Sequence, residues 1–346
     1  MEDDGKENTV NQFSHLRFRD AFDFRLYTCS KVRFNNKSHH LTHELFSHHL
    51  TLSREVKEYS GLLEGVVDLH VHTAPDVLQR AVDDLEYLEA LNNIGYTAYL
   101  SKNHFTETAS RAYLLSRSSK RTKVLGGIVL NWPVGGLNPS AVDKALAMGA
   151  AEVWMPTLDA ENHIRTFGSA TLPATNRVRT FRSYRTQGGG IRILDGSGEL
   201  KAEVIEILEL VAESNTILGT GHLSPEEVYK LLEAAKKVGI KKILVTHPHF
   251  KGTRFKTEDQ IRLVSMGAIM EHCAIAGYNP GELAEDIRKV GPNNCIISSD
   301  AGQPHKGHPV DVLLKMILDL KEHGISDHDI ELMIKRNPAR LVEDLL

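Results

Sequence analysis

From residue 65 onward, short apolar runs alternate with longer segments in which apolar residues recur every three or four positions. The first pair shows the pattern: GVVDLHVH (65–72) is rich in β-branched residues, and AVDDLEYLEALNNIG (81–95) has helical spacing. Further apolar runs cover 97–101, 123–130, 151–156, 216–220, 241–246, 268–273 and 294–299, and further helical segments cover 108–119, 139–149, 201–214, 224–239, 257–267, 281–291 and 309–324. The sequence therefore predicts eight strands, each followed by a helix.

Signals at the ends of the helical segments support these boundaries. Ser224-Pro225-Glu226-Glu227 has the order of a capping box with proline at the first helical position. Glycines stand where four helical segments end, at Gly239, Gly267, Gly291 and Gly324. Because strand–helix alternation indicates a parallel sheet, eight repeats predict an α/β fold, a closed (β/α)8 TIM barrel. An open doubly wound sheet is the alternative, but no glycine-rich phosphate loop follows the first strand.

Two segments do not follow the alternation. Residues 1–57 mix charged residues with Asn, Ser and His without a lasting period, so we expect an N-terminal extension, disordered or loosely docked, before a barrel formed by 58–346. The five histidines within 39–49 leave a metal-binding tail as the alternative. The Arg- and Thr-rich stretch 158–190 is a long insertion after the fourth strand. We interpret it as a lid or a subunit contact whose arginines could meet an anionic substrate.

The composition narrows the class of protein. Of the 346 residues, 41% are apolar, which is enough for a sizeable core. A formal net charge of −4 argues against a general nucleic-acid binder, and the lack of a run of about 18 apolar residues argues against a membrane span. Three cysteines are too few for a disulfide framework or a cysteine-based zinc site. With the acidic start MEDDGKEN, which does not resemble a secretory signal, they favour a reducing, cytoplasmic location.

The end of the first strand has two histidines in alternate positions. Active sites of (β/α)8 barrels lie at the carboxyl ends of the strands, and alternate residues of a strand share a face. His70 and His72 are therefore expected to point the same way, with Asp68 below them. We expect the opposite face of the strand to point toward the helices, with the side chains of Val67, Leu69 and Val71. Two imidazoles with this spacing suit one metal ion, and a pair of hydrogen-bonded core histidines is the structural alternative.

Three further strands end in residues of the metal-binding type. His222 follows the fifth strand, His247 the sixth and Asp300 the eighth. Imidazoles with a carboxylate suit Zn²⁺, Mn²⁺, Fe²⁺ or Co²⁺ better than Mg²⁺ or Ca²⁺. The sequence therefore predicts a divalent transition-metal site at the barrel rim, most of all for Zn²⁺, with one or two ions.

This set of residues resembles that of the amidohydrolase superfamily of metal-dependent hydrolases, over residues 65–346. The strings DLHVHTAPD, SKNHFTETASRA and TGHLSPEE are also similar to an uncharacterised amidohydrolase-like group. The resemblance implies that the metal ligands are His70, His72, His222, His247 and Asp300. It further implies that Asp300 takes a proton from the attacking water.

The sequence departs from that pattern at the fourth strand. Many members have a carboxylated lysine or a glutamate there that bridges two metals, whereas this strand ends in Trp154-Met155-Pro156-Thr157. Either one ion is bound, or the bridge comes from elsewhere. Lys102 and His104 after the second strand are the first substitutes, and Glu271 on the seventh is the next. We expect Glu152, which begins the fourth strand, at the opposite end of the barrel in a structural role.

Other polar residues near the strand ends are candidates for substrate contacts. His249 shares a face with His247, so it could replace that residue as a ligand, and either His104 or His249 could protonate a leaving group. Asp76 and Arg80 either touch substrate or form a surface salt bridge. His305 and His308, after the last strand, are expected at the rim rather than on the metal.

The leading hypothesis is hydrolysis of an amide, lactone or other ester by a metal-activated water. A metal-dependent phosphoesterase and a decarboxylase are alternatives on the same barrel, and a non-catalytic barrel that binds a ligand is the third. The expected partner is a small-molecule substrate, and a homo-oligomer is compatible with the sequence. The identity of the substrate depends on the shape of the loops, which the ligand set does not determine.

Overall fold

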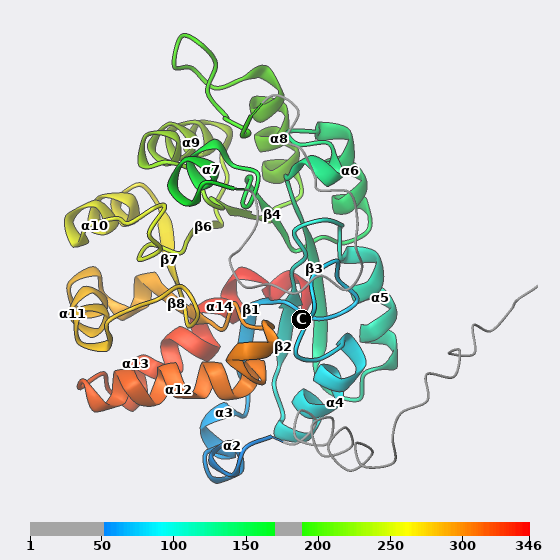
Figure 1. Ribbon diagram of the computed structural model, residues 1–346, viewed down its shortest axis with the longest axis vertical. Coiled ribbons are helices and arrows are strands. Elements are labelled where there is room, and N and C mark those ends of the chain that lie inside the picture. The colour runs from blue at the N-terminus through cyan, green and yellow to red at the C-terminus, as the bar shows by residue number, and fades with distance from the viewer. Residues whose placement is uncertain (1–51, 170–188) are drawn as a thin grey trace, which may run out of the picture. The chain divides into compact units, whose positions relative to one another are not determined.

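The computed structural model describes residues 52–169 and 189–346, and its centre is one sheet of eight parallel strands (Figure 1). The strands pair in chain order, and they are β1 Val67–Val71, β2 Ala98–Ser101, β3 Lys123–Val129, β4 Glu152–Trp154, β5 Ile217–Gly219, β6 Ile243–Thr246, β7 Ala268–Cys273 and β8 Cys295–Ser298. The sheet closes where the Asp300 amide donates to the His70 carbonyl at 2.7 Å and the His72 amide to the Ala301 carbonyl at 2.8 Å. The predicted (β/α)8 barrel is confirmed.

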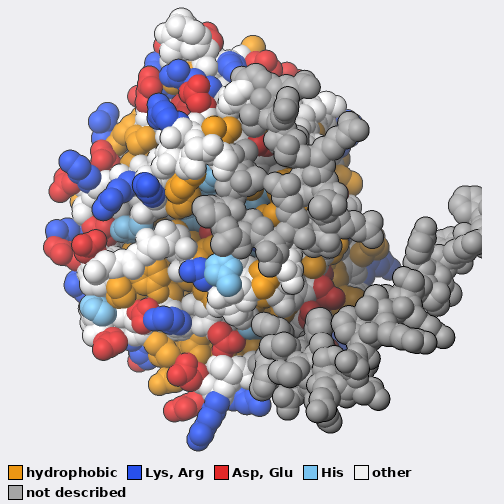
Figure 2. Space-filling view, in the orientation of Figure 1, with side chains coloured by type: hydrophobic (Ala, Val, Ile, Leu, Met, Phe, Trp, Pro, Cys, Tyr) orange, Lys and Arg blue, Asp and Glu red, His pale blue; other side chains and the backbone are white. Residues whose placement is uncertain are grey.

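The predicted helices surround the strands. They are α4 Asp84–Ile94, α5 Ala109–Ser118, α6 Pro139–Ala147, α8 Ala202–Glu213, α9 Pro225–Val238, α10 Thr257–Ser265, α11 Pro280–Val290 and α12 Pro309–Glu322. The capping box of α9 is formed as predicted, since the Ser224 side chain accepts from the Glu227 amide and the Glu227 side chain accepts from the Ser224 amide. No helix in the described ranges is long and apolar enough to cross a membrane. Cationic and anionic side chains are interspersed on the face in Figure 2.

Several elements lie outside the predicted alternation. Before the barrel are α2 Arg54–Glu58 and α3 Ser60–Leu63, α7 Glu161–Phe167 lies within the predicted insertion, and the chain ends with α13 Asp327–Glu331, the π-helical segment η4 Leu332–Arg336 and α14 Asn337–Leu341. Short 3-10 turns are η1 Trp132–Val134, η2 Pro292–Asn294, η3 Pro304–Lys306 and η5 Glu343–Leu345.

The N-terminal boundary of the barrel lies earlier than position 58. Val56 on α2 is fully buried, and α2 contacts α12, so the last residues of the predicted extension belong to the barrel body. The rest of that extension, with its histidine-rich stretch, lies outside the described residues. Residues 170–188, which include most of the arginines of the predicted insertion, also lie outside the described residues.

The strands separate an inner apolar cluster from an outer one. The inner cluster includes Leu100, Val129, Trp154 and Leu244, and the C-terminal residues Leu341 and Val342 join it. The outer cluster fills the space between the outward faces of the strands and the helices. This arrangement leaves the interior of the barrel to a few large side chains, and it determines which strand positions can face a site.

A β-bulge in β1 changes which of its side chains face the interior. Val67 and Asp68 pair with Ala98 and Tyr99, but Val71 pairs with Ser101, so β1 has one extra residue in between. Val67 and Leu69 consequently belong to the inner cluster and Val71 to the outer one. The predictions that Val67 and Leu69 face the helices and that Asp68 lies below the two histidines are wrong, because a bulge resets the alternation of a strand.

His308 caps α12, and it offers a test of the fold that does not involve the predicted metal ligands. Its Nδ1 accepts a hydrogen bond from the Val310 amide at 3.2 Å. Burial lowers the pKa of His308 from 6.5 to about 4, so the folded protein keeps it neutral. The unfolded chain binds a proton there below pH 6.5, and stability is therefore present above that pH and lost as the pH falls to about 4.

We expect His308→Asn to keep the cap, because asparagine also supplies an acceptor, and to remove this pH dependence. The free energy of unfolding, measured in urea at pH 7 and at pH 4, should fall by roughly 3 kcal/mol more in the wild type than in the variant. Equal pH dependence in the two proteins would show that burial does not depress this pKa.

Candidate metal centre

Asp300 is the point at which the predicted metal ligands meet. Its Oδ1 lies 3.0 Å from His70 Nε2 and 3.1 Å from His72 Nε2, and its Oδ2 lies 3.4 Å from His247 Nε2. The His222 ring is next to His247, with 5.5 Å between ring centroids. All five residues are buried. The structure thus brings together the five residues predicted from the ends of β1, β5, β6 and β8.

Two of these residues have left-handed backbone conformations. His247 has a φ of 54° and Asp300 a φ of 49°, which are uncommon outside glycine. His247 directly follows β6, and Asp300 comes two residues after the end of β8, so the chain turns there. Two residues after Asp300, Gly302 has a φ of 143°, and a Cβ at Gly302 would overlap the His72 carbonyl. The close approach of β1 to the chain after β8 therefore depends on glycine at this position.

The protonation states of the cluster suit a cation. Burial opposes ionisation of Asp300, but the charges of His70 and His247 and hydrogen bonds from the histidines hold its pKa well below the usual range. Burial lowers the pKa of His72 and of His222 well below 6.5. For His70, burial acts against protonation, but the Asp300 and Glu271 carboxylates outweigh it and raise the pKa. A bound metal ion would take the place of that proton.

Lys102 is fully buried beside this cluster. Its Nζ lies 2.9 Å from His70 Nε2 and 4.9 Å from the centre of the Trp154 ring. Glu271 Oε1 accepts a hydrogen bond from His70 Nδ1 at 3.2 Å. Burial lowers the pKa of Lys102, although the carboxylates of Asp300 and Glu271 act in the opposite direction. Lys102, a first-choice substitute for the missing bridge, therefore lies close to the predicted ligands.

Glu152 lies within the same interior, which the sequence analysis did not expect. Its carboxylate and the Trp154 indole occupy the space over Gly219, where a Cβ would overlap both. Burial raises the pKa of Glu152 well above its usual value; the charge of Glu271 adds to this effect, and that of Lys102 opposes it. An acidic residue two positions before an inward-facing tryptophan is the sequence signal that could have indicated this location.

His104 stacks on His72, with 4.8 Å between ring centroids, and its Nδ1 lies 2.9 Å from Thr157 Oγ1. Burial, followed by the charges of His72 and Lys102, lowers the pKa of His104 well below 6.5. His104 is therefore a neutral imidazole at neutral pH. Its position at the site agrees with the prediction, but its charge state favours a hydrogen-bonding role over that of a strong acid.

Asp76 and Arg80 form a buried ion pair instead of the surface salt bridge considered from the sequence. The Arg80 guanidinium lies 2.6 Å from Asp76 Oδ2, and both side chains are almost fully buried. The same guanidinium donates to His72 Nδ1 at 3.3 Å. Arg80 therefore acts on the orientation of His72, and a contact of either residue with substrate stays a prediction.

His249 is not part of the cluster. Its Nε2 lies 3.7 Å from Asp286 Oδ2, and its ring is next to that of His272. It lines a separate surface pocket of about 750 Å³ between the loops that precede α10 and α11. The prediction that His249 shares a face with His247 is wrong, because the left-handed turn at His247 interrupts the alternation of the strand. A role of His249 in binding substrate at that pocket stays a prediction.

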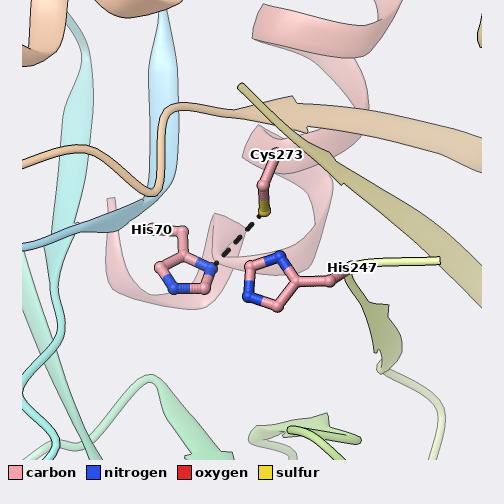
Figure 3. A group of neighbouring side chains, drawn as sticks. All are labelled: His70, His247 and Cys273. Carbon is pink, nitrogen blue, oxygen red and sulfur yellow. Dashed lines mark hydrogen bonds between the residues drawn. The ribbon is translucent and has the colours of Figure 1, made fainter. Parts of the chain in front are cut away.

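Two residues of the site were not identified as such from the sequence. His163 on α7 faces His222, with 2.9 Å between their Nδ1 atoms, and burial lowers its pKa to about 4. Cys273 ends β7, and its Sγ lies 3.7 Å from His70 Nδ1 (Figure 3). His163 lies in the stretch 158–190, which the sequence predicts as an insertion, and the sequence analysis considers the cysteines only as a group.

The eight parallel strands and their surrounding helices form a TIM barrel, and solved structures support this fold. The chain is similar to an amidohydrolase from Pseudomonas aeruginosa, with 11% identity, 83% of this chain and 98% of that chain covered, and a TM-score of 0.57. It is also similar to a β-aspartyl dipeptidase from Fervidobacterium islandicum, with 13% identity, 81% of this chain and 75% of that chain covered, and a TM-score of 0.53. A third similar structure is a putative 2-pyrone-4,6-dicarboxylic acid hydrolase from Pseudomonas putida, with 13% identity, 82% of this chain and 98% of that chain covered, and a TM-score of 0.51.

Residues 65–271 match the model of a family of unknown function, DUF6282, and the chain belongs to this family. The matched range begins just before β1 and ends within β7, so it includes four of the five predicted metal ligands. A comparison with curated proteins gives no significant match.

Proposed function

We propose that this protein is a metal-dependent hydrolase that uses an activated water on an amide, lactone or other ester of a small molecule. The divalent transition-metal ion, most of all Zn²⁺, binds at His70, His72 and Asp300, with His222 and His247 beside it. The observation that carries the proposal is the buried Asp300 carboxylate, whose Oδ1 lies within 3.0 and 3.1 Å of two imidazole nitrogens.

The donor set fits such an ion. The ligand atoms of His70, His72 and Asp300 lie within 4.8 Å of one another. Ligands about 2.0–2.1 Å from a tetrahedral zinc stand about 3.3 Å apart, which is close to the observed separations. Two contacts would have to give way: the Arg80 hydrogen bond to His72 Nδ1, and the contact of Lys102 Nζ with His70 Nε2.

The chain's own residues supply the remaining chemistry. When bound, the ion supplies Lewis acidity that polarises a carbonyl oxygen and acidifies water. Asp300, held ionised, orients the water and accepts its proton. Lys102 is a stronger acid than a solvated lysine because burial lowers its pKa, so it is the better donor to a leaving group. The neutral His104 accepts or donates a hydrogen bond to substrate.

The similar solved structures include an amidohydrolase and a β-aspartyl dipeptidase, and their names agree with hydrolysis. A phosphoesterase or a decarboxylase on the same barrel remains the alternative. Release of inorganic phosphate from a phosphoester panel would favour the first, and release of CO₂ would favour the second. Stable ligand binding without turnover in a metal-loaded protein would favour the non-catalytic barrel.

We expect the full-length protein, purified after metal-replete expression, to contain about one or two equivalents of a transition metal, which elemental analysis measures. His70→Ala should lower the affinity for Zn²⁺ by at least about 10- to 100-fold, because it removes a ligand rather than an outer partner. His323→Ala is the matched control, since His323 is exposed on the C-terminal side of α12. Failure of the wild type to take up metal on titration, or unchanged affinity in His70→Ala, would overturn the proposal.

A further inference from the structure

The His70 and His247 rings present two sides to the interior of the barrel. Their centroids are 5.2 Å apart, and the Nε2 atom of each faces Asp300, at 3.0 and 3.4 Å. The Nδ1 atoms belong to the other side of each ring. The proposed hydrolytic ion uses only the Nε2 side of these rings, and it leaves His247 Nδ1 without an assigned partner.

Cys273 lies on the Nδ1 side. Its Sγ is 3.7 Å from His70 Nδ1, and the ligand atoms of Cys273, His70 and His247 lie within 4.8 Å of one another (Figure 3). The thiol is buried, and its other hydrogen-bonding neighbour is the Glu271 carbonyl at 3.9 Å. Two imidazoles and a thiol therefore converge from β1, β6 and β7.

His247 supplies an independent observation at the same place. Its Nδ1 is buried and has no hydrogen-bond partner within residues 52–169 and 189–346. An unpaired polar nitrogen in a protein interior is destabilising, so such groups usually have a ligand, an ion or a water as partner. Beside a thiol and a second imidazole, a soft divalent cation is the partner that all three groups share.

We propose that Cys273, His70 and His247 form a second metal position that takes a thiophilic divalent ion such as Cd²⁺. A neutral imidazole has one free lone pair, so His70 cannot bind an ion at Nε2 and another at Nδ1 at the same time. The two positions therefore exclude each other at His70. Soft ions favour the thiolate position, and hard ions such as Mn²⁺ favour the carboxylate position at Asp300.

This inference goes beyond the proposed hydrolase, since occupancy of the Cys273 position would draw His70 away from the hydrolytic ion. An ion there replaces the thiol proton, which passes to solvent, and it displaces the hydrogen bond from His70 Nδ1 to Glu271. We therefore expect Cd²⁺ to inhibit a Mn²⁺-loaded enzyme, and to do so without removing Asp300 or His72 from their places.

The test is a titration of the full-length protein with Cd²⁺ and Co²⁺, in a Cys29→Ser background, followed by ultraviolet absorption. A thiolate ligand gives a sulfur-to-metal charge-transfer band, which should be lost in Cys273→Ser together with about 10- to 100-fold in Cd²⁺ affinity. Cys295→Ser is the matched control, because Cys295 is also a buried free cysteine, on β8, and it should keep the band. X-ray absorption of the wild-type protein loaded with Cd²⁺ needs no variant at Cys273, and it should show one sulfur ligand.

The outcomes separate this inference from the proposed function. Metal uptake with no charge-transfer band and no sulfur ligand would overturn the Cys273 position and leave the hydrolytic site intact. A band that Cys273→Ser removes, in a protein whose Mn²⁺ and Zn²⁺ binding is unaffected by His72→Ala, would support the Cys273 position and overturn the proposed hydrolytic site. Unchanged Cd²⁺ affinity in a folded Cys273→Ser protein would also overturn the inference.

Discussion

Replacing Asp300 with asparagine is expected to lower the rate of hydrolysis by about 10² to 10⁴-fold, while the protein stays folded and keeps most of its metal. Asparagine has nearly the same size and keeps one oxygen that can face His70 and His72. It has no charge and cannot accept the proton of the attacking water. The loss should therefore appear in kcat, measured on any amide, lactone or ester that the wild-type protein turns over, with metal content and melting temperature measured alongside.

Asp344→Asn is the control for this substitution, because Asp344 is an exposed aspartate in a surface ion pair with Lys242. It should leave both turnover and metal content unchanged. If Asp300→Asn retains near-wild-type turnover and instead has a lowered melting temperature, Asp300 is a structural residue, and the proton acceptor must be sought elsewhere. If it loses turnover only in proportion to lost metal, Asp300 is a ligand without a separate catalytic role.

Replacing Lys102 with methionine is expected to destabilise the metal-free protein by about 3–5 kcal/mol, the usual cost of removing one partner from a buried set of charges. Methionine fills a similar volume but removes a buried cation, whose pKa the carboxylates of Asp300, Glu271 and Glu152 act to raise. The carboxylates would then lie in the interior with less compensation. Urea unfolding in the presence of a chelator measures the effect without a bound ion.

Two further variants make the Lys102 result specific. Lys315→Met, which removes an exposed lysine paired with Asp319 on α12, should cost less than about 1 kcal/mol. Lys102→Met combined with Glu271→Gln should recover part of the lost stability, because one uncompensated carboxylate is removed together with the cation. A cost below about 1 kcal/mol for Lys102→Met alone would contradict the charge-balancing role.

The predicted ligands met because their positions follow from a general property of the fold. His222, His247 and Asp300 each come within three residues of the end of a strand, and the carboxyl ends of parallel strands converge at one rim of a barrel. Apolar periodicity alone was enough to find all eight strands and their helices, since a strand of a closed barrel must be covered on both faces. Knowledge of side-chain contacts was not needed for either step.

Side-chain direction was predicted less well, because it depends on backbone features that distant segments impose. The bulge in β1 moved Leu69 into the interior and Asp68 out of line with His70, and the turn at His247 separated His249 from the ligands. No residue type at either position indicates the bulge or the turn in the sequence. Both depend on contacts with other strands, which the alternation of side chains along a single strand does not predict.

The sequence by itself determined the (β/α)8 barrel and the five residues at its rim that meet around Asp300, since both depend on the order of apolar and polar residues along single elements. Only the tertiary structure decided the neighbours of that cluster: Arg80 on His72, His163 on His222, Cys273 on His70, and Glu152 inside the barrel. Those of His163 and Cys273 join segments that are far apart in the chain. They depend on how closely strands and helices pack in three dimensions, which no local pattern records.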